Sequence, residues 1–160
     1  MAKQSRKSAN PLNLDSFLCF AVYSAGHAFN RVYKALLDEL GLTYPQYLLL
    51  VALWEQDDQT VGMLGEKLFL ESSTLTPLIK RLESMGLLAR SRDPLDERQV
   101  RVRLTARGRA LREKALEIPP CVLAASGLKP EDLRRLTSEL AALRSVLENY
   151  KPDAGRRPER

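Results

Sequence analysis

The chain has 160 residues, of which 44% are hydrophobic, enough for a packed core in one domain with additional helices. No apolar run reaches the roughly 20 residues that span a bilayer, and no signal peptide follows the basic N-terminus, so we expect a cytoplasmic protein without a membrane partner. Two cysteines 102 positions apart and a single histidine have no metal-ligand spacing, so neither a metal nor another cofactor is expected.

The net charge of +5 is concentrated in one stretch of the chain. Between Lys80 and Lys114 there are eleven Lys and Arg residues against five Asp and Glu residues, and the rest of the chain is close to neutral. A localised basic segment is typical of a surface that meets a phosphate backbone, although a solvated basic face would give the same count. Charge alone leaves both interpretations open.

Apolar residues recur at three- and four-residue steps near the N-terminus and predict a first helix from about Asn13 to Leu40, ended by Gly41. The capping-box spacing of Thr43 to Gln46 predicts a second, almost wholly apolar helix from Tyr44 to Glu55. Asp57 to Gln59 are expected to form a turn, after which Thr60 caps a short third helix that ends at Leu68.

A fourth helix is expected to begin with Ser72 or Ser73 as its N-cap, with Pro77 within about the first turn and Gly86 after the end. One face of this helix is apolar and the opposite face is polar. Two short helices in succession, the second with a polar outer face, predict a helix-turn-helix.

After Gly86 the hydrophobic period changes from 3.6 to 2. Gln99 to Leu104 alternate as a half-buried strand, Leu87 to Arg92 are the expected partner strand, and Asp93 to Glu97 have turn composition. An arginine-rich hairpin behind a recognition helix predicts a wing, whose tip around Arg98 would reach a DNA minor groove.

Thr105 caps an expected fifth helix from Ala106 to Glu117, which Pro119-Pro120 interrupt, and Pro130 opens the last helix. Leucines at alternating steps of three and four in that last helix indicate pairing between subunits, or packing within one core. The predicted fold is mainly α with a small β-hairpin wing. Its predicted parts are disordered tails at 1–11 and 151–160, dimerisation helices at 12–41 and 106–150, and a winged helix-turn-helix at 42–105.

Over about residues 13 to 150 the chain resembles the MarR family of transcriptional regulators. The wing carries the family pattern Asp-x-Arg, followed by Leu-Thr, in Asp96 to Thr105. Further motifs resemble the organic hydroperoxide resistance repressors within that family. These motifs are Leu18-Cys19-Phe20, Leu42-Thr43-Tyr44-Pro45-Gln46-Tyr47-Leu48, Trp54-Glu55 and Leu75-Thr76-Pro77-Leu78-Ile79-Lys80-Arg81.

The resemblance implies a homodimer that binds a pseudo-palindromic double-stranded DNA operator, with one recognition helix in each major-groove half-site. It implies DNA contacts by two groups of residues. The recognition-helix group is Ser72, Ser73, Thr74, Thr76, Lys80 and Arg81. The wing group is Arg90, Arg98 and Asp96, the last of which orients Arg98.

Cys19 is the candidate redox sensor, although a lone cysteine in an apolar helix is more often an inert core residue. Tyr23 lies on the same helical face, one turn later. By resemblance, Tyr33 and Tyr44 would hydrogen-bond the reactive sulfur, partly across the dimer, and so favour the nucleophilic thiolate. The apolar neighbours of Cys19 favour an organic hydroperoxide as the signal.

Cys121 is the only other thiol and hence the candidate resolving residue. In this family the oxidised cysteine forms either an intersubunit disulfide or a mixed disulfide with a small thiol. Cys121 is displaced by a few positions from the place expected for a resolving cysteine, so an inert Cys121 remains open.

Three other functions compete with a thiol-regulated repressor. The first is a MarR-type repressor released by a small aromatic ligand in the dimer cleft, with Cys19 not a sensor. The second is a thiol peroxidase, but the chain lacks the alternating βαβ pattern of thioredoxin-like enzymes, so we expect no enzyme. The third is a winged helix used only for protein contact, which the basic segment disfavours.

Overall fold

The computed structural model describes residues 12–151, so the predicted tails lie outside this range, except for Lys151. The chain forms two compact units, of which one ends at Ile118 and the other begins at Pro119. The elements of the first unit are η1 (Leu14–Ser16), α1 (Leu18–Leu37), η2 (Asp38–Leu40), α2 (Tyr44–Glu55), β1 (Gln59–Thr60), α3 (Val61–Leu68), α4 (Ser72–Ser84), β2 (Leu88–Arg92), β3 (Val100–Leu104) and α5 (Ala106–Ala115). Then α6 (Ile118–Ser126) begins at the boundary, and α7 (Pro130–Glu148) follows.

The first predicted helix is divided into three pieces. Before α1, Phe17 has an extended backbone, and two local hydrogen bonds hold the preceding turn. The Ser16 hydroxyl donates to the Asn13 carbonyl at 2.7 Å, and Asn13 Oδ1 accepts from the Asp15 amide at 3.3 Å. Short polar side chains that bond nearby backbone compete with a continuous helix. At the other end Gly41, with φ of 65°, ends η2 as predicted.

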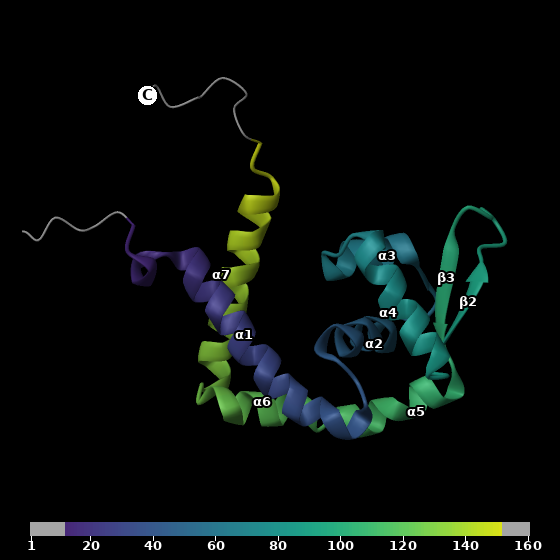
Figure 1. Ribbon diagram of the computed structural model, residues 1–160, viewed down its shortest axis with the longest axis horizontal. Helices are drawn as coiled ribbons and strands as arrows, with labels where there is room; N and C mark the ends of the chain where they lie inside the picture. The colour runs from purple at the N-terminus through teal and green to yellow at the C-terminus, as the bar shows by residue number, and fades with distance from the viewer. Residues whose placement is uncertain (1–11, 152–160) are drawn as a thin grey trace, which may run out of the picture. The chain divides into compact units, whose positions relative to one another are not determined.

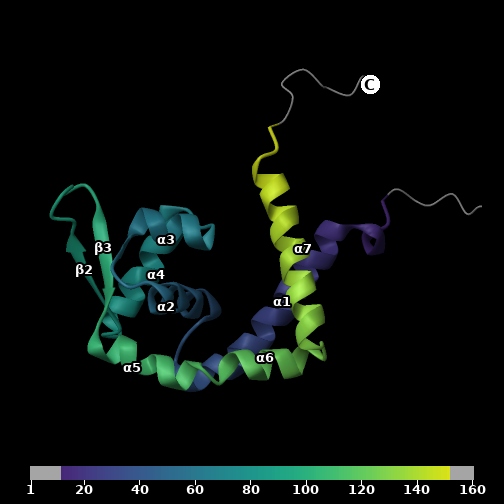
Figure 2. The same cartoon turned by 180° about the vertical axis from the view of Figure 1, so that it is seen from behind.

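The second helix, α2, has the predicted bounds and forms the centre of the core. The Thr43 amide donates to Gln46 Oε1 at 2.9 Å, one half of the predicted capping box. Leu49, Leu50 and Leu53 are completely buried. In the first unit, α2, α3 and α4 gather on one side of strands β2 and β3 (Figure 1; from behind in Figure 2).

The predicted turn at Asp57 to Gln59 is wrong at its last residue, because Gln59 and Thr60 form the short strand β1. This strand pairs antiparallel with β3, so the wing hairpin is extended to a three-stranded sheet in the order β1-β3-β2. The Gln59 side chain is 2% exposed and donates to the carbonyls of Ala52 and Gln56. A two-residue strand has no measurable period, so only its pairing reveals it.

The N-cap of α4 is Glu71 rather than Ser72 or Ser73, and Pro77 lies in the second turn, not the first. The Glu71 carbonyl accepts from the amides of Thr74 and Leu75, each at 3.0 Å, so the backbone itself starts the helix. Pro77 has no amide to offer the carbonyl of Ser73. Both residues are exposed, so the carbonyl lies on the solvent side and the helix continues through Pro77.

The predicted wing hairpin is confirmed, with β2 paired antiparallel to β3 and Arg90 opposite Val102. Behind it, Gly108 lies so close to the backbone that a Cβ there would be 2.1 Å from the Leu87 carbonyl oxygen. Trp54 Nε1 donates to the Gly108 carbonyl at 2.9 Å. Gly108 therefore allows α5 to approach both the wing and α2.

The fifth helix ends at Ala115 instead of Glu117, and the sequence did not predict α6 as a separate helix. Pro119 and Pro120 lie in the first turn of α6, where proline is tolerated, so they begin a helix as well as interrupt one. The last helix, α7, begins at Pro130 as predicted. Among residues 12–151 no helix is long and apolar enough to cross a membrane.

Candidate nucleic-acid interface and thiol site

The recognition helix α4 has one buried and one exposed face. Leu75, Ile79 and Leu82 are at most 1% exposed and anchor it to the core. Of the six residues predicted to face DNA, five are exposed: Ser72, Ser73, Thr74, Lys80 and Arg81. The sixth, Thr76, is half-buried, and its hydroxyl donates to the Ser72 carbonyl at 2.7 Å. The exposed face thus combines hydroxyl and cationic groups, which suits phosphates and base edges.

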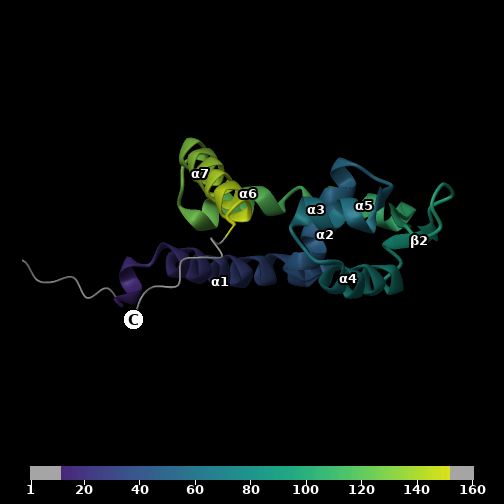
Figure 3. The ribbon, with the colours of Figure 1, turned by 90° about the horizontal axis from the view of Figure 1, so that it is seen from above.

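An ion pair joins α4 to the wing. Arg90 Nε donates to Glu83 Oε2 at 2.8 Å, and the Arg90 amide donates to Glu83 Oε1 at 3.2 Å. The Arg90 side chain bonded to this carboxylate holds the pKa of Glu83 below its usual value. Figure 3 shows α4 and β2 from above. Arg90, predicted as a DNA contact, therefore also fixes the wing to the recognition helix.

The wing tip presents a single arginine on an ordered loop. Asp96 Oδ1 accepts from the Arg98 amide at 3.1 Å and from Arg98 Nε at 3.3 Å, and Asp96 Oδ2 accepts from Gln99 Nε2 at 3.2 Å. The backbone amide of Arg98 is the largest cause that lowers the pKa of Asp96. The Arg98 side chain is 94% exposed. Asp96 is thus placed to orient Arg98 while leaving its guanidinium accessible.

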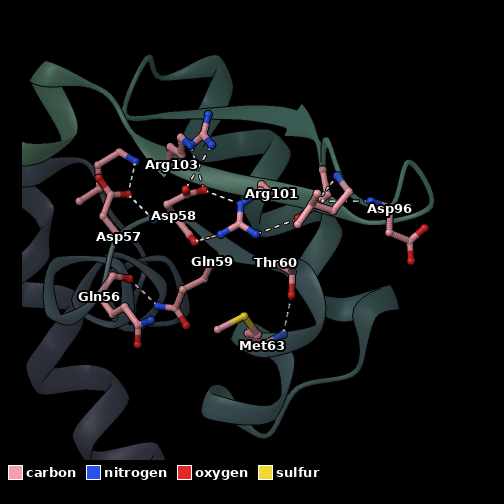
Figure 4. A network of polar contacts seen from close by, with 12 residues as sticks. Gln56, Asp57, Asp58, Gln59, Thr60, Met63, Asp96, Arg101 and Arg103 are labelled. Carbon is pink, nitrogen blue, oxygen red and sulfur yellow. Dashed lines mark hydrogen bonds and ion pairs between the residues drawn. The ribbon is translucent and has the colours of Figure 1, made fainter.

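Three other arginines of the basic segment are bound by acids within the unit, and Figure 4 shows two of them, Arg101 and Arg103. Arg101 and Arg103 both pair with Asp58, at 2.7 and 2.8 Å. Arg109 pairs with Asp57 at 2.9 Å. Hydrogen bonds from Arg103 and Arg101 lower the pKa of Asp58. Part of the charge that suggested DNA binding is therefore neutralised internally.

Asp57 and Asp58 were predicted only as turn residues, and their role as structural acids was not predicted. Arg101 and Arg103 are two positions apart in β3, so their side chains leave the same face of the sheet. Two cations on one strand face require counter-charges. The spacing of these two arginines was therefore the available indication that acidic partners lie nearby. Sequence alone does not reveal which acids supply them, since Asp58 is 43 positions from Arg101.

Cys19 lies in the first turn of α1, and its side chain is exposed. The residues around it are apolar: Leu18, Val22 and Tyr23 are 61%, 43% and 63% exposed. Tyr23, one turn from Cys19, also contacts the ring of His27 edge-on, with centroids 4.3 Å apart. The thiol is therefore accessible, in contrast to an inert core cysteine.

Tyr33 and Tyr44, hereafter the tyrosine pair, lie together near the other end of α1. Their rings stack with centroids 4.0 Å apart, and Tyr47 lies 5.8 Å from Tyr33. Burial, with smaller contributions from Tyr44 and Tyr47, raises the pKa of Tyr33 to about 12. The interaction with the Tyr33 hydroxyl opposes the rise in the pKa of Tyr44 caused by burial.

The structure does not bring Cys19 and the tyrosine pair together within one chain. Tyr33 follows Cys19 by 14 positions in the same helix, which corresponds to about 21 Å along the axis of α1. Cys121 is exposed on α6 in the other unit, and its pairing with Cys19 stays a prediction. Residues 12–151 contain no cluster of three or more His, Cys, Asp or Glu side chains that could hold a metal ion.

Comparison with known proteins places this arrangement in a family. Residues 31–115 match the family model described as transcriptional regulator SarA/Rot. Over 136 residues the chain is 46% identical to the organic hydroperoxide resistance transcriptional regulator of Bacillus subtilis, which covers 85% of this chain and 92% of the relative. It is 49% identical to the HTH-type transcriptional regulator TtmR of Methylorubrum extorquens over 86% of this chain and 71% of TtmR. The chain belongs to the MarR family of transcriptional regulators.

Solved structures support the same assignment. Reduced AbfR bound to DNA has a TM-score of 0.70 and 36% identity, over 81% of this chain and 90% of AbfR. Disulfide-formed AbfR has a TM-score of 0.60 and 37% identity, over 79% and 88%. A MarR family regulator from Rhodococcus sp. RHA1, at 21% identity and a TM-score of 0.74 over 82% and 95%, shares the fold. The predicted family, its organic hydroperoxide resistance type and the winged helix fold are confirmed, and this MarR-family member is a regulator rather than an enzyme.

Proposed function

We propose that this regulator is a cytoplasmic homodimeric repressor that leaves a pseudo-palindromic DNA operator when an organic hydroperoxide oxidises Cys19. The observation that carries the proposal is an exposed thiol at one end of α1 and a hydroxyl donor pair at the other. The organic hydroperoxide resistance regulator of Bacillus subtilis supports the choice of signal.

A second copy of the chain would complete the thiol site. The tyrosine pair is about 21 Å from its own Cys19, beyond the reach of a tyrosine side chain. If two α1 helices cross antiparallel, the first turn of one approaches the last turns of the other. Each Cys19 then meets the Tyr44 hydroxyl of the partner chain, which favours the thiolate by donating a hydrogen bond.

The exposed apolar face of α1 supports this pairing. Leu18, Val22 and Phe29 recur at steps of one helical turn or two, Tyr23 adjoins Val22, and the four are between 41% and 63% exposed. Large contiguous apolar patches on a folded surface mark association sites. Pairing of α1 with a second copy would remove these side chains from water and stabilise the dimer through the hydrophobic effect.

The proposed chemistry oxidises the sulfur by two electrons. The Cys19 thiolate attacks the terminal peroxide oxygen, the O–O bond breaks, and the alkoxide leaves as an alcohol after taking the thiol proton. The product is Cys19 sulfenic acid. A second thiol, either Cys121 or a small cellular thiol, then displaces water and forms a disulfide. The apolar residues around Cys19 favour a hydroperoxide with an organic group over hydrogen peroxide.

DNA binding is proposed for the exposed face of α4 and for the wing tip. The recognition helix would enter the major groove, and Arg98 would extend towards the adjacent minor groove. Reduced AbfR, a relative of similar fold, is solved bound to DNA, which supports this assignment. Disulfide formation near the N-terminus of α1 would shift the two recognition helices from the spacing that a two-fold operator requires.

The deciding experiment is an operator gel shift with reduced protein, before and after one equivalent of cumene hydroperoxide. Wild type should be released, and Cys19→Ser should stay bound at the same dose. Release of Cys19→Ser by peroxide would refute the proposal. Release of Cys19→Ser by a small aromatic anion, without peroxide, would favour a ligand-controlled repressor instead.

The Cys121→Ser variant separates the two resolving routes. If Cys121 forms the disulfide, this variant stays bound until a small thiol is added with the peroxide. If a small thiol is the resolving partner, wild type also needs the added thiol, and the two proteins are then released equally readily. Non-reducing electrophoresis distinguishes the two products, because only an intersubunit disulfide doubles the mass.

A further inference from the structure

Arg101, the second residue of β3, holds two separate loops with one guanidinium group (Figure 4). Its Nε donates to Asp58 Oδ1 at 2.7 Å and its Nη2 donates to the Asp58 carbonyl at 2.6 Å. Its Nη1 donates to Asp93 Oδ2 at 2.8 Å. The side chain is only 24% exposed, so its donors are used within the unit rather than offered to DNA.

The first loop leads directly into the helix-turn-helix. Asp58 has a left-handed backbone with φ of 58°, and the next two residues form β1. Thr60, the second of these, caps α3: its hydroxyl oxygen accepts from the Met63 amide at 3.2 Å. The Asp58 end of Arg101 is therefore fixed to the start of α3 through three consecutive residues.

The second loop is the wing tip itself. Asp93 Oδ1 accepts from the Leu95 amide at 2.8 Å and from the Asp96 amide at 3.4 Å. The Asp93 amide donates to the Gln99 carbonyl at 2.9 Å and closes the loop. Asp96 in turn holds Arg98, as described above. The Asp93 end of Arg101 is therefore connected to Arg98 through an unbroken series of hydrogen bonds.

We propose that Arg101 is a positioning residue that fixes the wing tip relative to the helix-turn-helix and so aims Arg98 at DNA. This inference rests on the proposed DNA-binding function. A planar guanidinium is required, because it can direct donors to Asp58 and Asp93 at once, whereas a lysine amine is a compact point charge without this fork.

Arg103 provides a matched control. It pairs with the same Asp58, through Nε at 2.8 Å and Nη2 at 3.1 Å, and leaves the same face of the same strand. No contact joins it to Asp93 in the described structure. Arg101→Lys and Arg103→Lys therefore make the same chemical change at one shared acid, but only the first disconnects the wing tip.

The first test is a double-mutant cycle on operator affinity with reduced protein. Arg98→Ala and Arg101→Lys should each weaken binding about tenfold, and the double variant should be little weaker than either single one, since both remove the same contact. Arg103→Lys should stay within about twofold of wild type. Multiplicative losses in the double variant, or an equal loss in Arg103→Lys, would overturn the proposal while leaving DNA binding itself intact.

The second test uses the free protein and does not depend on DNA binding. Amide hydrogen exchange at Leu95 and Asp96 should be at least tenfold faster in Arg101→Lys than in wild type, and unchanged in Arg103→Lys. Amides of α2 report whether the variants are folded. Equal protection at Leu95 and Asp96 in all three proteins would overturn the proposal. Failure of the wild type to bind any operator would refute the proposed function, and the exchange result would still decide what Arg101 holds.

Discussion

The ring of Tyr33 stacks on the ring of Tyr44, with centroids 4.0 Å apart, and each hydroxyl affects the pKa of the other. One tyrosine lies near the end of α1 and the other begins α2, so the contact joins two helices of the core. Burial is the largest cause that raises both pKa values. Both hydroxyls thus stay protonated at neutral pH and remain donors.

Removing the Tyr44 hydroxyl, the proposed donor to the sulfur, should slow the oxidation of Cys19. In Tyr44→Phe we expect the rate of release from operator DNA by cumene hydroperoxide to fall by about tenfold, because a hydrogen bond to a charged group is worth roughly 1.5–3 kcal/mol. Stopped-flow fluorescence of labelled operator measures that rate. Tyr47→Phe removes a hydroxyl from the same aromatic cluster and should react at nearly the wild-type rate. Equal rates in Tyr44→Phe and wild type would contradict the assignment of this donor.

The raised pKa of Tyr33 predicts how stability changes in alkali. The folded pKa of about 12 exceeds the ordinary value of 10.0, so the folded state holds this proton more tightly than the unfolded state. The contribution to stability is complete below pH 10 and is lost as the pH rises from 10 to 12. The free energy of unfolding, measured with urea between pH 9 and 12, should decline less steeply with pH in Tyr33→Phe than in wild type. Parallel declines would contradict the prediction.

Asp58 limits the number of arginines available to phosphates. Asp58→Asn keeps a residue type that tolerates the positive φ of 58°, but removes the charge that binds Arg101 and Arg103. We expect stronger binding to DNA that lacks the operator sequence. The slope of log K against log salt concentration should become steeper by about 1 to 2, since each neutralised phosphate contributes about 0.9 to it. Fluorescence anisotropy across a salt series measures both.

Glu117→Gln is the control for that experiment, because it removes the same charge from an exposed side chain in the turn between α5 and α6. Its salt dependence should match that of wild type. If Asp58→Asn and Glu117→Gln change the slope equally, only net charge matters and the internal ion pairs do not restrain the arginines.

Gly108→Ala tests the close approach of α5 to the wing. A Cβ at this position would lie 2.1 Å from the Leu87 carbonyl oxygen, so backbone must move, and we expect a loss of at least about 3 kcal/mol in the free energy of unfolding. At Gly62 the nearest atom to an added Cβ is Thr60 Oγ1 at 3.8 Å, an ordinary contact. Gly62→Ala should therefore be neutral or slightly stabilising in the same urea titration.

The elements with a strong period were predictable from the sequence, and those fixed by long-range pairing were not. The bounds of α2 and the start of α7 follow from apolar spacing, a capping box and a proline. The strand β1 has two residues and exists because Gln59 and Thr60 pair with β3. Local propensity likewise placed Pro77 one turn too early. Propensity predicts proline only near the start of a helix, whereas α4 continues through Pro77 on its exposed side, where the missing amide is tolerated.

The same distinction between local pattern and long-range pairing applies to the candidate site. The exposed face of α4 and the exposure of Arg98 follow from helix periodicity and turn composition. The internal use of Arg101 does not, because it depends on Asp58 and Asp93 meeting one guanidinium from loops 35 positions apart in sequence. Counting charges along the chain overstates the cations that face outward for this reason.

The 14-residue separation of Cys19 from Tyr33 has a genetic consequence if the sensor forms across two chains. A copy that lacks the sulfur and a copy that lacks the tyrosine hydroxyls are each inactive as sensors when alone. When expressed together they form mixed dimers in which one complete site is restored, contributed half by each allele. Peroxide resistance should therefore be regulated in a cell that carries both defective alleles, and in neither parent strain.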